Sequence, residues 1–355
     1  MGRRNMNILK DNSNYRIQGR YVIQDDVLYL AYSASYIEFR FCGRKVTADL
    51  ISDRIPEGEE FKAWAAVFIN GAETPSGRFF LEQGCHTYVL FESDEEQEIE
   101  LRLMKYSEAA FASFGVKSID VEGSGVFAVP ETKKPLIEFV GDSITCGYGI
   151  EGIAEKDVFT TAQENPWEAY ACRTARLLDM DFTLISWSGN GIISHWVPDT
   201  VNTPRNDEPL MPQLYPYSAL TLEQRLGKET GTLWQPEKKP DLVVVNLGTN
   251  DCSYTRCISE RNDVFEVEYR RFISGIREAN PDAKLICMFG MMDQRLTDQI
   301  RCAVEMLAAE GDEKLFFFHV PLQDPADGMG TDFHPSPVTH QKDAKLLAEF
   351  IKEIL

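Results

Sequence analysis

Three short polar segments of this 355-residue chain contain side chains that could together carry out acyl transfer. The segments are residues 141–145 (Gly-Asp-Ser-Ile-Thr), 248–251 (Gly-Thr-Asn-Asp) and 332–335 (Asp-Phe-His-Pro). They supply a nucleophilic hydroxyl, an amide that can donate a hydrogen bond to an oxyanion, and an imidazole base with a carboxylate beside it. Each segment follows an apolar run, and loops after parallel strands are where open α/β sheets hold their chemistry.

Ser143 needs a nearby base, because a serine alkoxide is not available at neutral pH. A serine at the end of a strand also commonly caps a helix, so Ser143 alone would indicate little. His334 strengthens the functional interpretation, since it lies in a polar turn two residues after Asp332. A carboxylate in that position can hold Nδ1 and leave Nε2 free to take the serine proton. The alternative is that Asp332 only caps the turn before Pro335.

Two further residues at strand ends are candidate oxyanion donors. Asn250 follows the apolar run 242–247, and Gly189 lies in the segment 186–191 (Ser-Trp-Ser-Gly-Asn-Gly). The Asn250 carboxamide and the backbone N–H groups of Ser143 and Gly189 can donate to a developing negative charge. Each residue alone is typical of a turn, but their placement on successive strand ends predicts one site.

The pattern of apolar residues predicts two domains that position these residues. Up to about residue 130 the chain has short β-branched or aromatic runs at 27–32, 36–41, 65–69, 87–91, 98–103 and 119–121. These runs predict a β-sandwich, plausibly a jelly roll, over residues 1–130. Residues 131–135, between two prolines, form a predicted linker to a second domain at 136–355.

Strands and helices alternate in the second domain. Predicted strands lie at 136–141, 182–187, 241–248, 283–289 and 315–320, and predicted helices lie at 167–179, 263–279, 295–310 and 338–354. This alternation predicts a parallel five-stranded sheet of the flavodoxin-like type, covered on both faces. The segment 196–240 is rich in Pro, Tyr and Trp, and it is expected to be a functional excursion or a lid-like loop.

The three segments 141–145, 248–251 and 332–335, together with the segment 186–191 that contains Gly189, resemble the four blocks of the SGNH (GDSL) hydrolases over residues 136–355. An N-terminal β-sandwich together with Asp-x-His, in place of the more common Asp-x-x-His, is similar to carbohydrate esterase family 2, whose members remove acetyl groups from sugar hydroxyls. The resemblance implies that Ser143 is the nucleophile, His334 the general base and Asp332 its orienter. It also implies an oxyanion hole of Ser143, Gly189 and Asn250. Thr331 stands where the usual acid of the wider family would be, which leaves the third member of the triad open.

The expected substrate is therefore an acetylated oligosaccharide derived from xylan, mannan or glucan. The alternatives are a lipase or thioesterase of the same fold with longer acyl substrates, and a carbohydrate-binding protein without activity. Trp196 and Trp234 are candidates for stacking on sugar rings. Three alternative roles stay open for the β-sandwich: it binds glycan, it braces the active site, or it forms a homo-oligomer interface.

Composition excludes several other partners. The formal net charge of −20 and the pI of about 4.7 oppose binding to nucleic acid or an anionic membrane.

Residues 147–152 match GxGxxG without the strand and helix that a dinucleotide site requires, so no cofactor is expected. Because the N-terminal residues contain no apolar stretch of signal-peptide length and the eight cysteines contain no CxxC pair, we expect a cytoplasmic protein with reduced thiols.

Overall fold

The computed structural model describes residues 4–53, 59–198 and 203–355, so residues 1–3 of the N-terminus and 199–202 of the segment 196–240 lie outside the description. The chain divides into two compact units. Unit 1 contains residues 1–133, 160–162 and 218–232, and unit 2 contains residues 134–159, 163–217 and 233–355. The segments 160–162 and 218–232, which were expected in the second domain, thus belong to unit 1.

Unit 1 is built on one antiparallel sheet of nine strands. Along its main path the strands follow the order β3-β4-β9-β5-β8-β6-β7, while β1 pairs with β9 and β2 pairs with β5. The strands are β1 (Arg4–Asn7), β2 (Tyr15–Gln18), β3 (Tyr21–Gln24), β4 (Val27–Leu30), β5 (Tyr36–Ser52), β6 (Trp64–Ile69), β7 (Gly77–Phe80), β8 (Gly84–Lys105) and β9 (Gly115–Phe127). A β-sandwich of the jelly-roll type was predicted; the β-rich N-terminal domain is confirmed, and its strands are connected in one antiparallel sheet.

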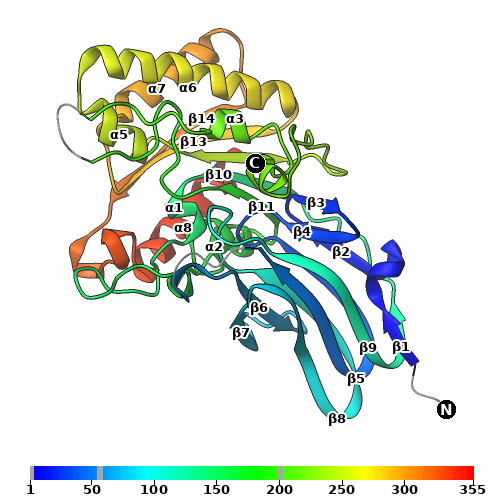
Figure 1. The fold of residues 1–355 in the computed structure, drawn as a ribbon. Coiled ribbons are helices and arrows are strands. Elements are labelled where there is room, and N and C mark those ends of the chain that lie inside the picture. The colour runs from blue at the N-terminus through cyan, green and yellow to red at the C-terminus, as the bar shows by residue number, and fades with distance from the viewer. Residues whose placement is uncertain (1–3, 54–58, 199–202) are drawn as a thin grey trace. The chain divides into compact units, whose positions relative to one another are not determined.

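Three long, curved strands dominate this sheet, as Figure 1 shows for β5, β8 and β9. The predicted strands at 87–91 and 98–103 are parts of the single strand β8, in which Glu92 and Gln97 pair with β5 on either side of residues 93–96. Alternation along β5 buries Phe39 and Phe41 completely in the core of the unit, where Leu101 and Phe114 also lie. Among the described residues of this unit, α4 (Leu220–Arg225) is the one helix of more than one turn, and it comes from the segment 218–232.

Unit 2 contains a parallel sheet of five strands in the order β11-β10-β12-β13-β14. The strands are β10 (Leu136–Gly141), β11 (Asp181–Ser186), β12 (Leu242–Asn246), β13 (Lys284–Met291) and β14 (Leu315–Leu322). All residues of β10 and β12 are buried, as expected for strands covered on both faces. The prediction of a flavodoxin-like five-stranded sheet is confirmed.

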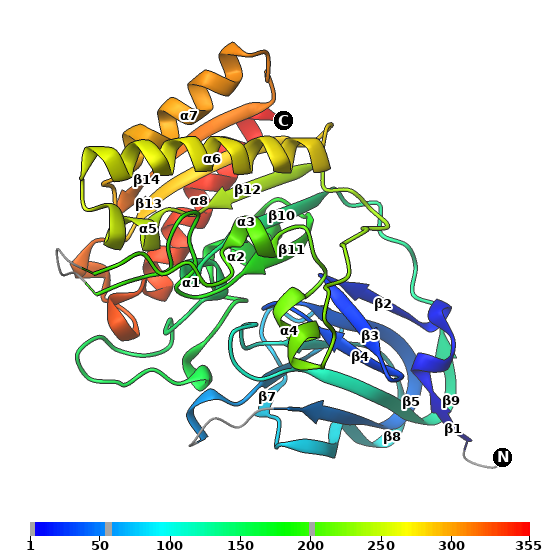
Figure 2. The same cartoon turned by 45° about the horizontal axis from the view of Figure 1, so that its top comes forward.

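Helices cover both faces of this sheet (Figures 1 and 2). Helices α6 and α7 pack against each other, and α2 and α8 form a second pair. The helices of unit 2 are α1 (Ser143–Cys146), α2 (Tyr170–Leu177), α3 (Met211–Leu214), α5 (Thr249–Thr255), α6 (Ser259–Ala279), α7 (Thr297–Ala309) and α8 (Pro337–Ile354). The four predicted helices correspond to α2, α6, α7 and α8. Helix α5 was missed, and it begins within the segment 248–251 (Gly-Thr-Asn-Asp).

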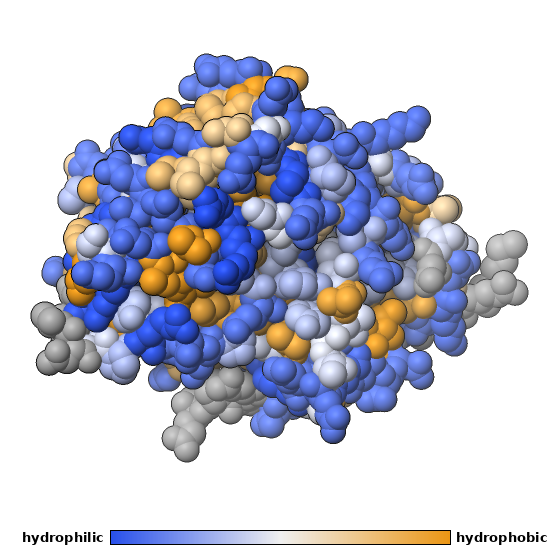
Figure 3. Space-filling view, turned by 90° about the horizontal axis from the view of Figure 1, so that it is seen from above, coloured by the Kyte–Doolittle hydropathy of each residue, from blue (hydrophilic) through white to orange (hydrophobic). Residues whose placement is uncertain are grey.

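In the part of the chain that the structure describes, none of the helices is both long enough and apolar enough to cross a membrane. Figure 3 shows one face that is mostly hydrophilic, with its hydrophobic side chains in separate groups.

Candidate active site

The turn after β10 holds Ser143 at the carboxyl edge of the sheet. Asp142 ends the turn, and its carboxylate accepts a hydrogen bond from the Ile144 N–H at 3.0 Å, which caps α1. A Cβ atom at Gly141 would lie 2.0 Å from Thr145 Oγ1, so this position accepts only glycine. The Ser143 side chain therefore leaves the strand in a defined direction, and the residue is only 6% exposed.

His334 lies beside this hydroxyl, although 191 residues separate the two in the chain. Its Nε2 is 2.8 Å from Ser143 Oγ, a distance that allows direct proton transfer. The residue follows a short 3₁₀ helix (Thr331–Phe333) and precedes α8, whose first turn Ser336 caps. The structure therefore brings together the predicted nucleophile and the predicted base.

The other nitrogen of His334 has a partner that the sequence did not predict. Nδ1 is 3.1 Å from the carbonyl oxygen of Thr331. A carbonyl only accepts, so Nδ1 carries the proton and Nε2 is the free base, which is the tautomer that general-base catalysis requires.

Asp332 was expected to contact Nδ1, and that expectation is wrong for this structure. Asp332 adopts a left-handed backbone conformation (φ 53°, ψ 34°), and its carboxylate accepts a hydrogen bond from the Tyr148 hydroxyl at 2.9 Å. The Tyr148 ring also lies against the His334 imidazole, with centroids 4.4 Å apart, and stacks on Phe159. Asp332 thus acts on the imidazole through its charge and through Tyr148. Tyr148, which follows Ser143 by five residues, was not predicted.

Burial sets the protonation state of His334. Loss of water around the imidazolium lowers the pKa of His334 to about 4, while the Thr331 carbonyl and the Asp332 charge act in the opposite direction. At neutral pH the imidazole is therefore uncharged and able to accept the serine proton.

Two backbone donors remain open beside the nucleophile. Among the described residues, the N–H groups of Ser143 and Gly189 have no hydrogen-bond acceptor. Gly189 has a positive φ of 75°, and Trp187, two residues before it, donates its N–H to the Gly141 carbonyl, which ties this loop to the end of β10. Nearly all buried backbone donors in proteins are paired, so open ones in this position are suited to an oxyanion.

Asn250 is held from two sides. Its Nδ2 donates to the Asn190 carbonyl at 2.8 Å and to the Asp142 carboxylate at 3.2 Å. These bonds join the segment 141–145, the loop that carries Gly189 and the segment 248–251 into one network. The role of Asn250 as an oxyanion donor stays a prediction. It requires Asn250 Nδ2 to give up its longer hydrogen bond, to Asp142, and to donate to the substrate oxyanion instead.

Asp251 is a functional residue that sequence reasoning missed. Its buried carboxylate accepts hydrogen bonds from the N–H groups of Ile192, Ile193 and Ser194, with distances of 2.7 to 3.1 Å. Burial raises the pKa of Asp251 to about 6, although the backbone donors oppose this. A Cβ atom at Gly191 would lie 2.6 Å from the carboxylate, so the glycine permits the approach. Asp251 therefore anchors the loop that carries Gly189.

The two predicted tryptophans differ in their positions. Trp196 is 59% exposed, and its N–H donates to the Gly189 carbonyl at 2.8 Å, which places it directly beside the open donors. Trp234 is half-buried, and its N–H donates to the Pro216 carbonyl. Substrate contact by either residue stays a prediction. The described residues contain no group of three His, Cys, Asp or Glu side chains arranged to hold a metal ion.

Comparison with known proteins identifies the family of this chain. The model of the GDSL-like lipase/acylhydrolase family matches residues 139–342, and that of the carbohydrate esterase 2 N-terminal domain matches residues 17–130. A cellulase/esterase, CelE, of Acetivibrio thermocellus is 32% identical over 98% of the chain, which spans 40% of that relative's length. An acetylxylan esterase/glucomannan deacetylase of Cellvibrio japonicus is 24% identical, covering 98% of this chain and 91% of the relative.

A solved structure has the same fold over nearly the whole chain. It is a family two carbohydrate esterase from Clostridium thermocellum in complex with cellohexaose, with a TM-score of 0.81 and 30% identity over 96% of this chain and 98% of that one. The predicted resemblance to this esterase family is confirmed. The chain belongs to the GDSL-like lipase/acylhydrolase family and carries ahead of that domain the N-terminal domain of family 2 carbohydrate esterases.

Proposed function

We propose that this protein is a serine esterase that removes O-acetyl groups from acetylated carbohydrates. The observation that carries the proposal is the distance of 2.8 Å between Ser143 Oγ and an uncharged His334 Nε2. The open N–H groups of Ser143 and Gly189 support it, because they complete the arrangement that acyl transfer needs.

In the first half of the reaction Ser143 Oγ attacks the acetyl carbonyl carbon while His334 Nε2 takes the hydroxyl proton. The carbonyl oxygen becomes an oxyanion and accepts hydrogen bonds from the two open N–H groups. When the intermediate collapses, the bond from the carbonyl carbon to the sugar oxygen breaks. His334 then returns its proton to that oxygen, and the sugar leaves with a free hydroxyl. The acetyl group remains bound to Ser143 as an ester.

In the second half a water molecule replaces the sugar. His334 takes one proton from the water as its oxygen attacks the acetyl carbon, and gives that proton to Ser143 Oγ when the ester bond breaks. The products are acetate and the free enzyme. The Thr331 carbonyl stabilises the imidazolium that forms in each half, because it accepts the Nδ1–H bond throughout.

The class of substrate is supported by the relatives and by the site. The names of the two curated relatives refer to esterase, acetylxylan esterase and glucomannan deacetylase activities. The exposed indole of Trp196 beside the Gly189 carbonyl offers an apolar face on which a sugar ring can stack.

The test is replacement of the nucleophile. Ser143→Ala should lower kcat for p-nitrophenyl acetate by about 10³-fold or more, because the covalent route is removed. A matched control is Ser274→Ala, whose hydroxyl bonds only to the Arg270 carbonyl within α6. Both variants should keep the circular dichroism spectrum and the Tm of the parent. A Ser143→Ala enzyme that retains most of its activity would remove the proposal.

Acyl length separates this proposal from a lipase or thioesterase of the same family. With p-nitrophenyl esters of increasing length, an acetyl esterase loses kcat/KM steeply beyond propionate. A maximum at longer chains would instead assign the protein to lipid or thioester substrates. Complete inactivity of the parent enzyme with tight binding of oligosaccharides would assign it to non-catalytic binding.

Location and oligomeric state stay predictions. All eight cysteines are free thiols, a state that a reducing compartment maintains, and this supports the proposed cytoplasmic location. Fractionation of the native cells tests the location, and light scattering tests whether the protein forms a homo-oligomer.

A further inference from the structure

A cavity on unit 1 lies outside the site described above. It has a volume of about 310 Å³ and opens on the outer face of the nine-stranded sheet. Its lining residues come from β5, β8, the end of β9 and the turn after β6, and all of them belong to unit 1: Arg40, Phe41, Asn70, Gly71, Glu98, Ile99, Glu100 and Phe127. The volume is at the small end of the range for ligand pockets, about 300–1,000 Å³.

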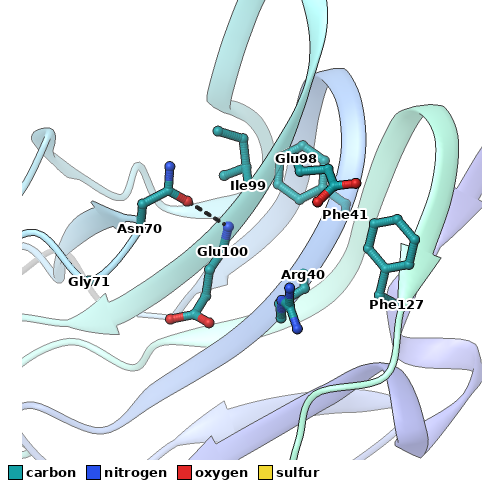
Figure 4. A pocket seen from close by; sticks show the side chains of 8 residues that line it. All are labelled: Arg40, Phe41, Asn70, Gly71, Glu98, Ile99, Glu100 and Phe127. Carbon is teal, nitrogen blue, oxygen red and sulfur yellow. Dashed lines mark hydrogen bonds between the residues drawn. The ribbon is translucent and has the colours of Figure 1, made fainter.

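The sheet register explains why three of these side chains meet. Arg40 on β5 is paired directly with Glu100 on β8 and with Phe127 on β9. Paired residues of an antiparallel ladder point to the same face, so an aromatic ring, a guanidinium and a carboxylate form one row across the sheet. Glu98 lies two residues from Glu100 on this face (Figure 4). Phe41 and Ile99 alternate with them, so their side chains point to the opposite face and are buried in the core, directly beneath this row.

One wall of the cavity is held rigidly. Asn70 donates its N–H to the Glu100 carbonyl at 2.8 Å and accepts the Glu100 N–H on Oδ1 at 2.9 Å, the bond drawn in Figure 4. The carboxamide nitrogen of Asn70 has no acceptor among the described residues. The wall thus offers a hydrogen-bond donor toward a ligand.

The charges in the cavity are not paired with each other, unlike their neighbours. Two residues along β5 from Arg40, Glu38 forms ion pairs with Arg16 at 2.7 Å and with Arg102 at 2.8 Å. Within the described part of the chain, by contrast, Arg40, Glu98 and Glu100 take part in no ion pair. The ring of Phe127 is 40% exposed beside them.

We propose that this cavity is a second saccharide site, which holds an unacetylated sugar ring of the kind of glycan that the catalytic unit deacetylates. A sugar hydroxyl both donates and accepts, so it can bridge Arg40 and the carboxylates of Glu98 and Glu100. The apolar face of the ring stacks on Phe127. The inference rests on the proposed function only for the identity of the glycan.

Other ligands fit the cavity less well. An anion would meet two carboxylates and the field of a chain with a net charge of −20. A lysine side chain of a peptide would meet the Arg40 guanidinium within the same row. A neutral polyhydroxylated ring satisfies both signs of charge together with the aromatic face.

The test uses the full chain labelled with ¹³C at the isoleucine δ1 methyl groups and titrated with unacetylated cello-, xylo- and manno-hexaose. Ile99 borders the cavity and its side chain packs in the core directly beneath it, whereas Ile193 lies in the loop that Asp251 anchors, so their methyl resonances report on the two sites separately. One of the hexaoses should shift the Ile99 resonance in a saturable manner. Phe127→Ala and Arg40→Gln should each weaken that binding by about tenfold or more, the equivalent of about 1.4 kcal/mol.

The matched control is Val89→Ala, at an exposed position of β8 outside the cavity, which should leave the affinity unchanged. The inference is overturned by an Ile99 resonance that does not move while Ile193 responds. It is also overturned by Phe127→Ala and Arg40→Gln variants that bind with the parental affinity, or by a lysine-rich peptide that shifts Ile99 when no hexaose does. Because unacetylated sugars require no hydrolysis, these outcomes do not depend on the Ser143→Ala assay that decides the proposed function.

Discussion

At the scale of single residues, the partner of the imidazole is the main finding. His334 donates from Nδ1 to the Thr331 carbonyl, while the Asp332 carboxylate is bound to Tyr148. A backbone carbonyl can fix the tautomer as a carboxylate does, but it carries no full negative charge to stabilise the imidazolium. The base in this site is therefore oriented by the main chain, and Asp332 contributes electrostatics from a distance.

This arrangement predicts unequal effects of two substitutions. Asp332→Asn should lower kcat by less than about tenfold, far below the ~10⁴-fold loss seen when a triad aspartate is replaced by asparagine. Asparagine also accepts the left-handed conformation of this position. His334→Ala should lower kcat by about 10³-fold or more. Steady-state kinetics with p-nitrophenyl acetate measures both, and a loss in Asp332→Asn equal to that in His334→Ala would restore the carboxylate as orienter.

The pKa of His334 predicts the acid limit of activity. The base works only when uncharged, so kcat/KM should fall as the pH decreases through about 4, the value to which burial lowers the His334 pKa. Since the Asp332 charge raises that pKa, Asp332→Asn should move the limit to lower pH. A pH–rate profile of both enzymes, corrected for unfolding by circular dichroism, gives the measurement. A limit near 6.5 in the parent would mean that the imidazole is well hydrated.

At the scale of elements, two segments hold the proposed oxyanion donor Gly189 in place. Helix α5 begins within the segment 248–251, and its Asp251 binds the backbone of the loop after β11. The carboxylate is completely buried and pairs with N–H groups instead of a cation. The local position of Gly189 therefore depends on a residue of another motif.

Removal of this anchor should reduce catalysis without removing a catalytic group. Asp251→Ala leaves three buried N–H groups without an acceptor, at a cost of about 1–3 kcal/mol each, and should lower kcat by about 10²-fold as the loop shifts. Asp251→Asn should retain more activity, because Oδ1 can still accept from Ile193 and Ser194. The control is Asp298→Asn, whose side chain is 88% exposed on α7.

The pH profile distinguishes anchoring from general destabilisation. Burial raises the pKa of Asp251 to about 6, so the parent should show a shallow decrease in kcat below pH 6, before the larger decrease that His334 causes. Asp251→Asn has no group that titrates there and should lack the shallow step. If the step persists in this variant, another group produces it.

The elements themselves could largely be predicted from the sequence. Leu242–Asn246 is a continuous β-branched run, and such a run indicates a strand buried on both faces. The helix α5 could not be found in this way, because it has seven residues and begins with polar groups that also suit a turn. The Thr331 carbonyl and the anchoring role of Asp251 were missed for another reason. Backbone carbonyls and N–H groups occur at every position, so their use as partners leaves no signal in the residue types.

At the scale of the whole molecule, the division of the chain differs from a simple order of two domains. Residues 160–162 and 218–232 pack with unit 1, although they lie within the sequence of the second unit. The segment 196–240 was expected to be a functional excursion or a lid, and residues 218–232 of it instead form part of unit 1, including α4. Long-range packing of this kind depends on which surfaces are available, and local residue patterns do not specify it.

The net charge of −20 leads to a prediction about substrate choice. A strongly acidic protein repels acidic ligands over a distance comparable to the Debye length, which falls from about 30 Å at 0.01 M to about 3 Å at 1 M ionic strength. For acetylated xylo-oligosaccharides that carry glucuronic acid, kcat/KM should therefore rise severalfold as salt is added. Neutral oligosaccharides of the same length and acetyl content should respond much less.

Comparison of the two substrates cancels effects of salt on the chemical step, since both pass through the same Ser143 and His334 reaction. The difference should lie in KM, because encounter and binding are the steps on which repulsion acts. An equal response of the two substrates to salt would mean that electrostatic repulsion of the acidic substrate does not govern encounter. Where only the acidic substrate responds, the exposed carboxylate of Asp332 is the first group to neutralise, since it lies two residues from the base. A salt response that disappears in Asp332→Asn would then assign the repulsion to a single residue.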